Sequence, residues 1–205
     1  MSEGRLSRAR LALVILAGGV LAVGGGAAVA GGMFRPPVFR GTAYDPPAAA
    51  PPLDFTGSDG KPVSMAALRG HPVFVFFGYT HCPDVCPLTL SRIIASLQGA
   101  GSDGEDARVL FVTVDPARDT PAVMAEYTRR LGPQVIGAIG DSATLARAQA
   151  AYGAYVVPAR PGEPTSMGHS SAVYGIDRKG RLRVLISEMR STEEIRDDVR
   201  TLVGL

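Results

Sequence analysis

One stretch decides the fold of this chain: VFVFFGYTHCPDVCP, residues 73–87. Its first five residues, Val73–Phe77, form a continuous apolar run, which is typical of a central strand buried on both faces of a sheet. The residues that follow hold Cys82 and Cys86 and lead into a segment predicted to be helical to about Gln98, where glycines end it. A buried strand, a cysteine-containing loop and a helix are therefore expected in direct succession.

The same alternation continues towards the C-terminus. Val109–Val114 is a second buried strand, and Asp119 and Thr120 are cap residues before an N1 proline that begins a helix to Leu131. The further predicted elements are a hairpin of Leu53–Phe55 and Pro62–Val63, a short helix from Ser64 to Leu68, a strand over Val135–Ile139, a helix over Ala143–Tyr152, a strand over Tyr155–Val157, a hairpin of Ala172–Ile176 and Leu182–Ser187, and a last helix from about Ser191. This order predicts an α/β domain with a mixed sheet.

Composition excludes several classes of protein. The chain has 205 residues, a formal net charge of +2, 46% hydrophobic residues and two cysteines. Because 21 basic and 19 acidic residues nearly balance, the basic surface that nucleic-acid binding needs is not expected. Two cysteines are too few for a disulfide-stapled miniprotein or a four-thiolate zinc site. One globular domain is the expectation for this length.

The N-terminal residues predict a membrane segment. Residues 1–10 carry three arginines, and residues 11–34 contain no ionisable side chain. A helix of about 20 apolar residues spans a bilayer, and flanking arginines stay in the cytoplasm. We therefore predict a cytoplasmic basic segment (1–10) and a single-pass anchor (11–34). The alternative is a signal peptide with an apolar core over Leu11–Val23 and a cleavage site at Ala28–Ala30.

Both alternatives place the remaining chain outside the cytoplasm. Residues 35–52 are rich in proline and alanine, so they are predicted to be an extended linker. Residues 53–205 are then the exported domain, and its nearly neutral charge gives no reason to expect electrostatic adhesion to the membrane.

Cys82 and Cys86 are the main candidates for chemistry. If Cys86 lies in the first turn of the predicted helix, both sulfurs lie at its N-terminal end, where a thiolate is favoured. A structural disulfide is one interpretation, although so short a loop constrains the unfolded chain little. A thiol–disulfide oxidoreductase usually has two residues between its cysteines rather than three, and no motif supports a peroxidatic cysteine. Binding of a soft metal fits the pair but needs a third ligand from elsewhere in the chain.

The three histidines differ in what their positions predict. His81 directly precedes Cys82, so its side chain should point away from the sulfurs, and His71 is expected at the surface. His169 follows a Pro- and Gly-rich loop, and loops often carry functional side chains. Two thiolates and one imidazole suit copper in either oxidation state, or zinc with a water.

Two further residues are candidates at the edge of such a site. Met167 is a candidate weak thioether ligand, with packing as the alternative. Asp115 follows the second buried strand and either lies near the site or forms the turn before Pro116.

Taken together, these residues resemble the Sco/SenC family of thioredoxin-like copper chaperones. The similarity lies in the block FGYTHCPDVCP at 77–87, the block VDPARDTP at 114–121, and GHS at 168–170, and it runs from about Leu53 to the C-terminus. One departure is Gly168, where family members often have an acidic residue. The resemblance implies a thioredoxin-like three-layer domain in which Cys82, Cys86 and His169 hold Cu(I) or Cu(II).

The resemblance also implies a role. The protein would be a metallochaperone rather than an enzyme, and it would deliver copper to the binuclear site of cytochrome c oxidase subunit II. We expect a location at the bacterial inner membrane with the domain in the periplasm, and a periplasmic thiol reductant that keeps the cysteines reduced. The alternatives are a thiol–disulfide reductase for oxidase cysteines and a copper or redox sensor.

Overall fold

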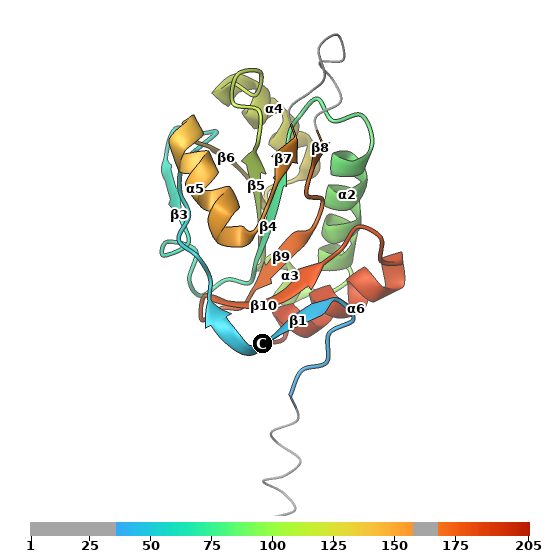
Figure 1. Ribbon diagram of the computed structural model, residues 1–205. Helices are drawn as coiled ribbons and strands as arrows, with labels where there is room; N and C mark the ends of the chain where they lie inside the picture. The colour runs from blue at the N-terminus through green and yellow to red at the C-terminus, as the bar shows by residue number, and fades with distance from the viewer. Residues whose placement is uncertain (1–35, 158–167) are drawn as a thin grey trace, which may run out of the picture. The chain divides into compact units, whose positions relative to one another are not determined.

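The computed structural model describes residues 36–157 and 168–205, and Val38–Leu205 form one compact unit (Figure 1). The predicted basic segment (1–10), the predicted membrane anchor (11–34) and Met167 lie outside the described residues. Among the helices of the described ranges, none combines the length and the apolarity that a membrane crossing requires.

Three parallel strands form the centre of the sheet: β4 (Val73–Gly78), β5 (Arg108–Thr113) and β6 (Val135–Ile139). Every residue of β4 is buried, as expected for a strand covered on both faces. β4 and β5 pair in register, with Phe76 opposite Phe111. The two strands predicted from apolar runs are therefore confirmed as neighbours in the core.

Antiparallel strands flank this centre on both sides. The predicted C-terminal hairpin is β9 (Val173–Ile176) and β10 (Arg181–Ile186), and β9 pairs with β4. On the other side, the hairpin of β2 (Asp54–Gly57) and β3 (Pro62–Ser64) joins β6. The strand order is β1-β10-β9-β4-β5-β6-β2-β3, which confirms the predicted α/β class with a mixed sheet.

The segment predicted to be a linker differs from that prediction. Within residues 35–52, Thr42–Ala49 form the edge strand β1, which pairs with β10. Pro46 and Pro47 lie where the register shifts between Ala43 and Ala48, and proline is tolerated at such irregular places on an edge strand. A proline-rich backbone is extended in either setting, so composition alone did not separate an edge strand from a free linker.

A buried carboxylate on the last helix, α6 (Thr192–Val203), anchors the start of β1. Asp198 is fully buried and accepts hydrogen bonds from the backbone N–H groups of Arg40 and Gly41. Burial raises the pKa of Asp198, and the two backbone donors oppose that rise. The folded unit therefore includes residues before Leu53, the boundary that the sequence predicted.

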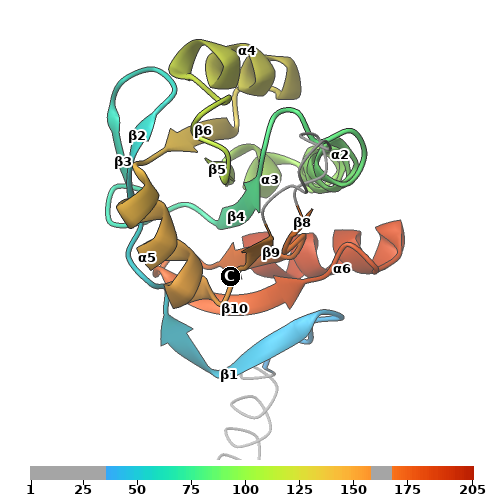
Figure 2. The same ribbon diagram turned by 45° about the horizontal axis from the view of Figure 1, so that its top comes forward.

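Helices cover both faces of the sheet and complete three layers (Figure 2). α2 (Val85–Gln98) packs against α6 on one face, and α5 (Ser142–Tyr152) lies on the other. α4 (Pro121–Leu131) contacts β6, and Thr120 caps its N-terminus with a side chain that accepts from the N–H of Val123. All four helices were predicted; the short α3 (Ser102–Glu105) was not, and the residues after Ser64 form turns instead of a helix.

Alternating side chains of β4 divide the aromatic core between the two faces. The ring of Phe77 packs edge to face on Tyr152 of α5, whereas the ring of Phe76 stacks on Phe111. Phe111 in turn stacks on Tyr127 of α4. Because successive residues of a strand point to opposite faces, Phe76 and Phe77 belong to the two different sides of the core.

Candidate metal centre

Cys82 lies in the loop after β4, and Cys86 lies in the first turn of α2. The backbone N–H of Cys86 points at the Cys82 sulfur from 3.5 Å, and the two thiols are not joined by a disulfide. The first N–H groups of a helix have no partner within the helix and favour negative charge. The two sulfurs therefore lie at the N-terminus of α2, as the sequence predicted.

Gly78, the last residue of β4, lets Cys86 approach the sheet. A Cβ added at Gly78 would lie 2.9 Å from Cys86 Sγ and 2.7 Å from a ring carbon of Phe111. Both neighbours are fully buried. The absence of a side chain at position 78 therefore leaves the space that the Cys86 sulfur occupies.

His169 comes from a separate small sheet. It belongs to β8 (Gly168–His169), which pairs with β7 (Val156–Val157) and lies outside the C-terminal hairpin. Its Nε2 lies 3.3 Å from Cys86 Sγ, and its Nδ1 lies 3.0 Å from the carbonyl oxygen of Ser170. Since a carbonyl only accepts, Nδ1 carries the proton and donates it, which leaves the Nε2 lone pair directed at the sulfur.

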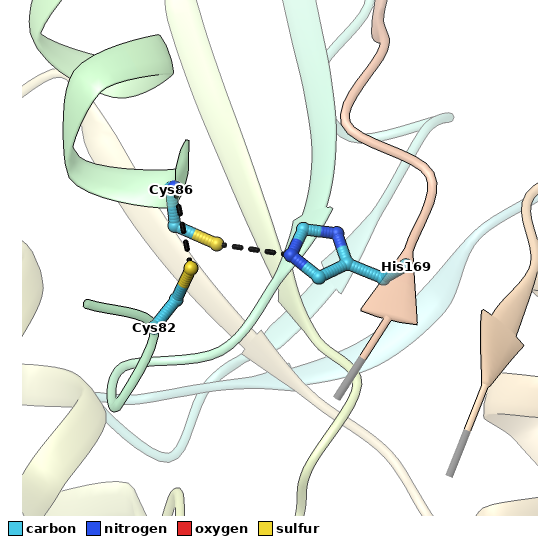
Figure 3. Close-up of side chains that lie close together, drawn as sticks. All are labelled: Cys82, Cys86 and His169. Carbon is cyan, nitrogen blue, oxygen red and sulfur yellow. Dashed lines mark hydrogen bonds between the residues drawn. The ribbon is translucent and has the colours of Figure 1, made fainter. Parts of the chain in front are cut away.

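Figure 3 shows the three side chains converging from the loop, the helix and the small sheet. Their donor atoms, two Sγ and one imidazole nitrogen, all lie within 4.8 Å of one another. Cys86 is buried, and Cys82 and His169 are partly exposed. The site is thus closed on the core side and open to a ligand from outside.

The two thiols differ in acidity. Partial burial by itself would raise the pKa of Cys82, but hydrogen bonds from the backbone N–H groups of Asp84 and Cys86 outweigh it and lower that pKa. Burial raises the pKa of the Cys86 thiol far above its ordinary value, and the neighbouring Cys82 charge adds to the rise. Cys82 is therefore the first of the pair to become a thiolate, and Cys86 ionises most readily when a cation compensates its charge.

Aromatic rings surround the imidazole. The ring of Tyr79 packs edge to face against His169 with centroids 5.5 Å apart, and Phe76 does the same at 6.1 Å. Both aromatic residues are at least 98% buried. The imidazole is held between the core and the sulfur, as ligation requires.

The remaining candidates have other partners. His81 is half exposed and has Thr80 and Asp119 as its neighbours, and His71 pairs with Asp106. Asp115 forms an ion pair with Arg118, and its backbone carbonyl accepts hydrogen bonds from the N–H groups of Arg118 and Asp119, so it forms a turn. Its predicted place at the edge of the site stays a prediction. Met167 lies outside the described residues.

One residue next to the site was not predicted. Asp119 was predicted to be a helix cap, but Thr120 caps α4, and the Asp119 side chain is fully buried against Thr80, two residues before Cys82. The sequence did contain a signal. A helix needs only one N-cap residue, so Asp119 beside the cap residue Thr120 was available for another role.

Comparison with known proteins agrees with this geometry. Residues 42–204 match the family model described as SCO1/SenC. The chain belongs to the SCO1/SenC family. Its relative SenC from Rhodobacter capsulatus is 36% identical over 129 residues, which cover 62% of this chain and 58% of that protein. The chain spans about half the length of the curated relatives it matches.

Solved structures of SCO1/SenC proteins share the fold. The copper-bound structure of ScoI from Bradyrhizobium japonicum is 38% identical, with a TM-score of 0.65 over 76% of this chain and 99% of that chain. The copper-bound structure of yeast Sco1 is 27% identical, with a TM-score of 0.66 over 75% of this chain and 87% of that chain. The resemblance read from the sequence and the thioredoxin-like fold it implies are both confirmed.

Proposed function

We propose that this SCO1/SenC protein is a copper chaperone that holds one copper ion with Cys82, Cys86 and His169 and delivers it to the binuclear copper site of cytochrome c oxidase subunit II. The observation that carries the proposal is the convergence of two sulfurs and one imidazole nitrogen within 4.8 Å. Thiolates are soft ligands that favour Cu(I), and an imidazole also suits Cu(II). Relatives whose structures contain copper support the choice of cargo.

The unequal exposure of the ligands supports transfer rather than storage. Cys82 and His169 are partly exposed, whereas Cys86 is buried. Ligands of an acceptor protein can therefore replace His169 and Cys82 first, while Cys86 keeps hold of the ion until the acceptor has bound it. Transfer by successive ligand replacement releases no free copper.

The setting of this activity is part of the proposal. Residues 11–34 anchor the protein in the bacterial inner membrane, residues 1–10 stay in the cytoplasm, and the unit Val38–Leu205 lies in the periplasm. Because thiols become oxidised in that compartment, a periplasmic thiol reductant must return Cys82 and Cys86 to the dithiol before copper binds. Because the basic and acidic residues of the chain nearly balance, the proposed function does not include binding of nucleic acid.

The test is an anaerobic titration of the fully reduced full-length protein with Cu(I) and, separately, with Cu(II). The expected result is one copper per chain, with thiolate-to-Cu(II) absorption in the second titration. Cys82→Ser is expected to abolish tight binding, and His71→Ala, which alters a histidine paired with Asp106, is expected to leave it intact. Tight binding that survives Cys82→Ser would overturn the proposed site.

A thiol–disulfide reductase is the second candidate, and the difference in acidity between the two cysteines favours it. The Cys82 thiolate would attack a substrate disulfide and form a mixed disulfide while one substrate thiolate leaves. Cys86 would then attack Cys82, releasing the second substrate thiol and leaving the protein oxidised. Reduction of an oxidase-subunit disulfide by the copper-free protein, together with no tight copper site, would make this the function.

A further inference from the structure

Asp119 connects the central sheet to the loop that carries the first cysteine. It lies between β5 and α4, and its side chain has no solvent exposure. His81 Nδ1 lies 3.4 Å from Asp119 Oδ1. A carboxyl group is costly to bury and persists when hydrogen bonds satisfy it.

The hydrogen bonds to Asp119 come from two places. Thr113 at the end of β5 donates its hydroxyl to Oδ2 over 2.6 Å. Thr80 donates twice, from its backbone N–H to Oδ2 over 3.0 Å and from its hydroxyl to Oδ1 over 2.5 Å. One end of this set is therefore fixed to the sheet, and the other end is the backbone of the cysteine loop.

The network extends one residue closer to the sulfur. His81 Nδ1 lies 3.0 Å from the Thr80 hydroxyl oxygen, which already donates its own hydrogen to Asp119. That oxygen can accept from Nδ1–H, so His81, Thr80 and Asp119 form a chain of donors and acceptors. His81 directly precedes Cys82 in the chain, and Cys82 is the partly exposed member of the cysteine pair.

We infer that Asp119 is a positioning residue of the metal centre: its buried carboxylate fixes Thr80 and His81 and thereby holds the Cys82 sulfur at the distance from Cys86 and His169 that one copper ion requires. The inference rests on the proposed copper site. Cys86 is placed by its helix and His169 by its strand pair, whereas Cys82 lies in a loop. A loop ligand needs an external support, and Asp119 supplies it from the turn before α4, where its own backbone N–H donates to the Asp115 carbonyl.

Three variants separate this role from a purely structural one. Asp119→Asn replaces an acceptor oxygen with a donor group. Thr80→Val removes the hydroxyl on the cysteine loop, and Thr113→Val removes the hydroxyl on β5. The last two changes are matched, since each deletes one hydroxyl that donates to the same carboxylate over a similar distance.

The first readout is copper binding by the full-length protein. Groups that orient a metal ligand typically contribute 10–100-fold to affinity, so Asp119→Asn is expected to weaken Cu(II) binding by about that factor. It is also expected to shift the energy of the thiolate-to-Cu(II) absorption. Thr80→Val should change both quantities in the same direction by less. Thr113→Val should leave both unchanged while lowering the unfolding temperature, because the backbone N–H of Asp119 still donates to the Asp115 carbonyl and keeps the carboxylate beside Thr80.

The second readout needs no copper. The protein dithiol is equilibrated with oxidised glutathione, so that one protein disulfide and two reduced glutathione molecules form for each glutathione disulfide consumed. If Asp119 holds Cys82 beside Cys86, Asp119→Asn and Thr80→Val lower this equilibrium constant, and Thr113→Val does not. This measurement tests Asp119 even if the wild-type protein binds no copper, in which case the proposed function alone fails.

If Asp119→Asn does not fold, the comparison of Thr80→Val with Thr113→Val tests the positioning role. Changes in absorption energy and in the glutathione equilibrium confined to Thr80→Val support the positioning role. Equal effects of Thr80→Val and Thr113→Val on both readouts, or no effect of either, would mean that Asp119 only stabilises the fold.

Discussion

Cys86 Sγ lies 3.3 Å from Nε2 of His169, although 83 residues separate the two in the chain. The contact depends on the pairing of β7 with β8, two strands of two residues each, which places His169 next to the N-terminus of α2. The strand that contains His169 has only two residues. The chemistry of the site therefore depends on this small sheet as much as on the cysteine spacing.

Removal of the imidazole should affect the two oxidation states of copper unequally. In His169→Ala the two thiolates remain, and a thiolate pair still suits Cu(I). We expect Cu(I) affinity to fall less than about tenfold and Cu(II) affinity to fall by more than the roughly 100-fold upper range for groups that only orient a ligand. Competition titrations with chelators of known affinity for each ion measure both values.

His71→Ala is the matched control for that experiment. His71 pairs with Asp106 and belongs to no donor cluster of the described residues. Its replacement should leave both copper affinities unchanged. Equal losses of Cu(I) and Cu(II) binding in His169→Ala would contradict the assignment of His169 as the ligand that accommodates Cu(II).

Alkylation should distinguish the two cysteines in the copper-free, reduced protein. The pKa of Cys82 is lowered and that of Cys86 is raised by burial, and only the thiolate reacts with iodoacetamide. Near pH 7.5, Cys82 should react at least about tenfold faster than Cys86. Tandem mass spectrometry locates the modified residue, and Cys82→Ser and Cys86→Ser each isolate one thiol. Comparable rates at the two sites would refute this difference in acidity.

Local patterns in the sequence were sufficient for much of the fold. The apolar runs that became β4 and β5 required burial on both faces, and each predicted helix carried its own start or stop signal, such as Thr120 before Pro121. Cys82 and Cys86 were recognisable because their spacing puts two sulfurs at one helix end. These features depend on residues that are close together in the chain.

Features that depend on distant residues were not predicted. β1 forms because β10 offers a free edge and Asp198 binds the backbone before the strand, and neither fact is visible in the proline-rich sequence itself. The buried role of Asp119 depends on Thr80, 39 residues earlier. His169 was proposed because it follows a loop, because a soft metal needs a third ligand and because GHS at 168–170 resembles the family's block. Its contact with Cys86 is seen only in the structure.

Gly78→Ala should damage the site from the sheet side. The new methyl group would lie under 3 Å from Cys86 Sγ and from the Phe111 ring, and neither neighbour is the free end of a flexible side chain. Overpacking of this kind costs about 1–3 kcal/mol. Urea unfolding should show that loss, and copper binding should weaken because Cys86 is displaced.

Gly99→Ala is the comparison for Gly78→Ala. Gly99 ends α2 with a right-handed conformation, and an added Cβ there has its nearest contacts at 3.6 Å. Its effect on unfolding should stay within about 0.5 kcal/mol, with copper affinity unchanged. If the two alanine variants were equally stable and bound copper equally well, the close packing of Gly78 against Cys86 would not be required for copper binding.

Asp177 should make the stability of the domain dependent on pH. Its side chain is 2% exposed and forms ion pairs with Arg181 and Arg183 across the β9–β10 turn. Burial alone would raise the pKa of Asp177, but hydrogen bonds from the Arg181 backbone and from both guanidinium groups outweigh it and hold the pKa below its ordinary value. The folded-state pKa is thus lower than the unfolded-state pKa, so the ionised side chain stabilises the fold.

The sign of that shift fixes the pH range. The contribution of Asp177 is complete above about pH 4, the pKa of the unfolded chain, and is lost as the pH falls through the lower folded-state value. Asp177→Asn should cost about 3–5 kcal/mol at pH 7, because it leaves buried Arg183 without its partner. The difference from the wild type should shrink as the pH falls below 4, since the wild-type carboxylate is then neutralised. Urea unfolding at pH 7, 5 and 3 measures it, with the exposed Asp54→Asn as the control, and a difference that is the same at pH 3 as at pH 7 would rule out an ionised, stabilising Asp177.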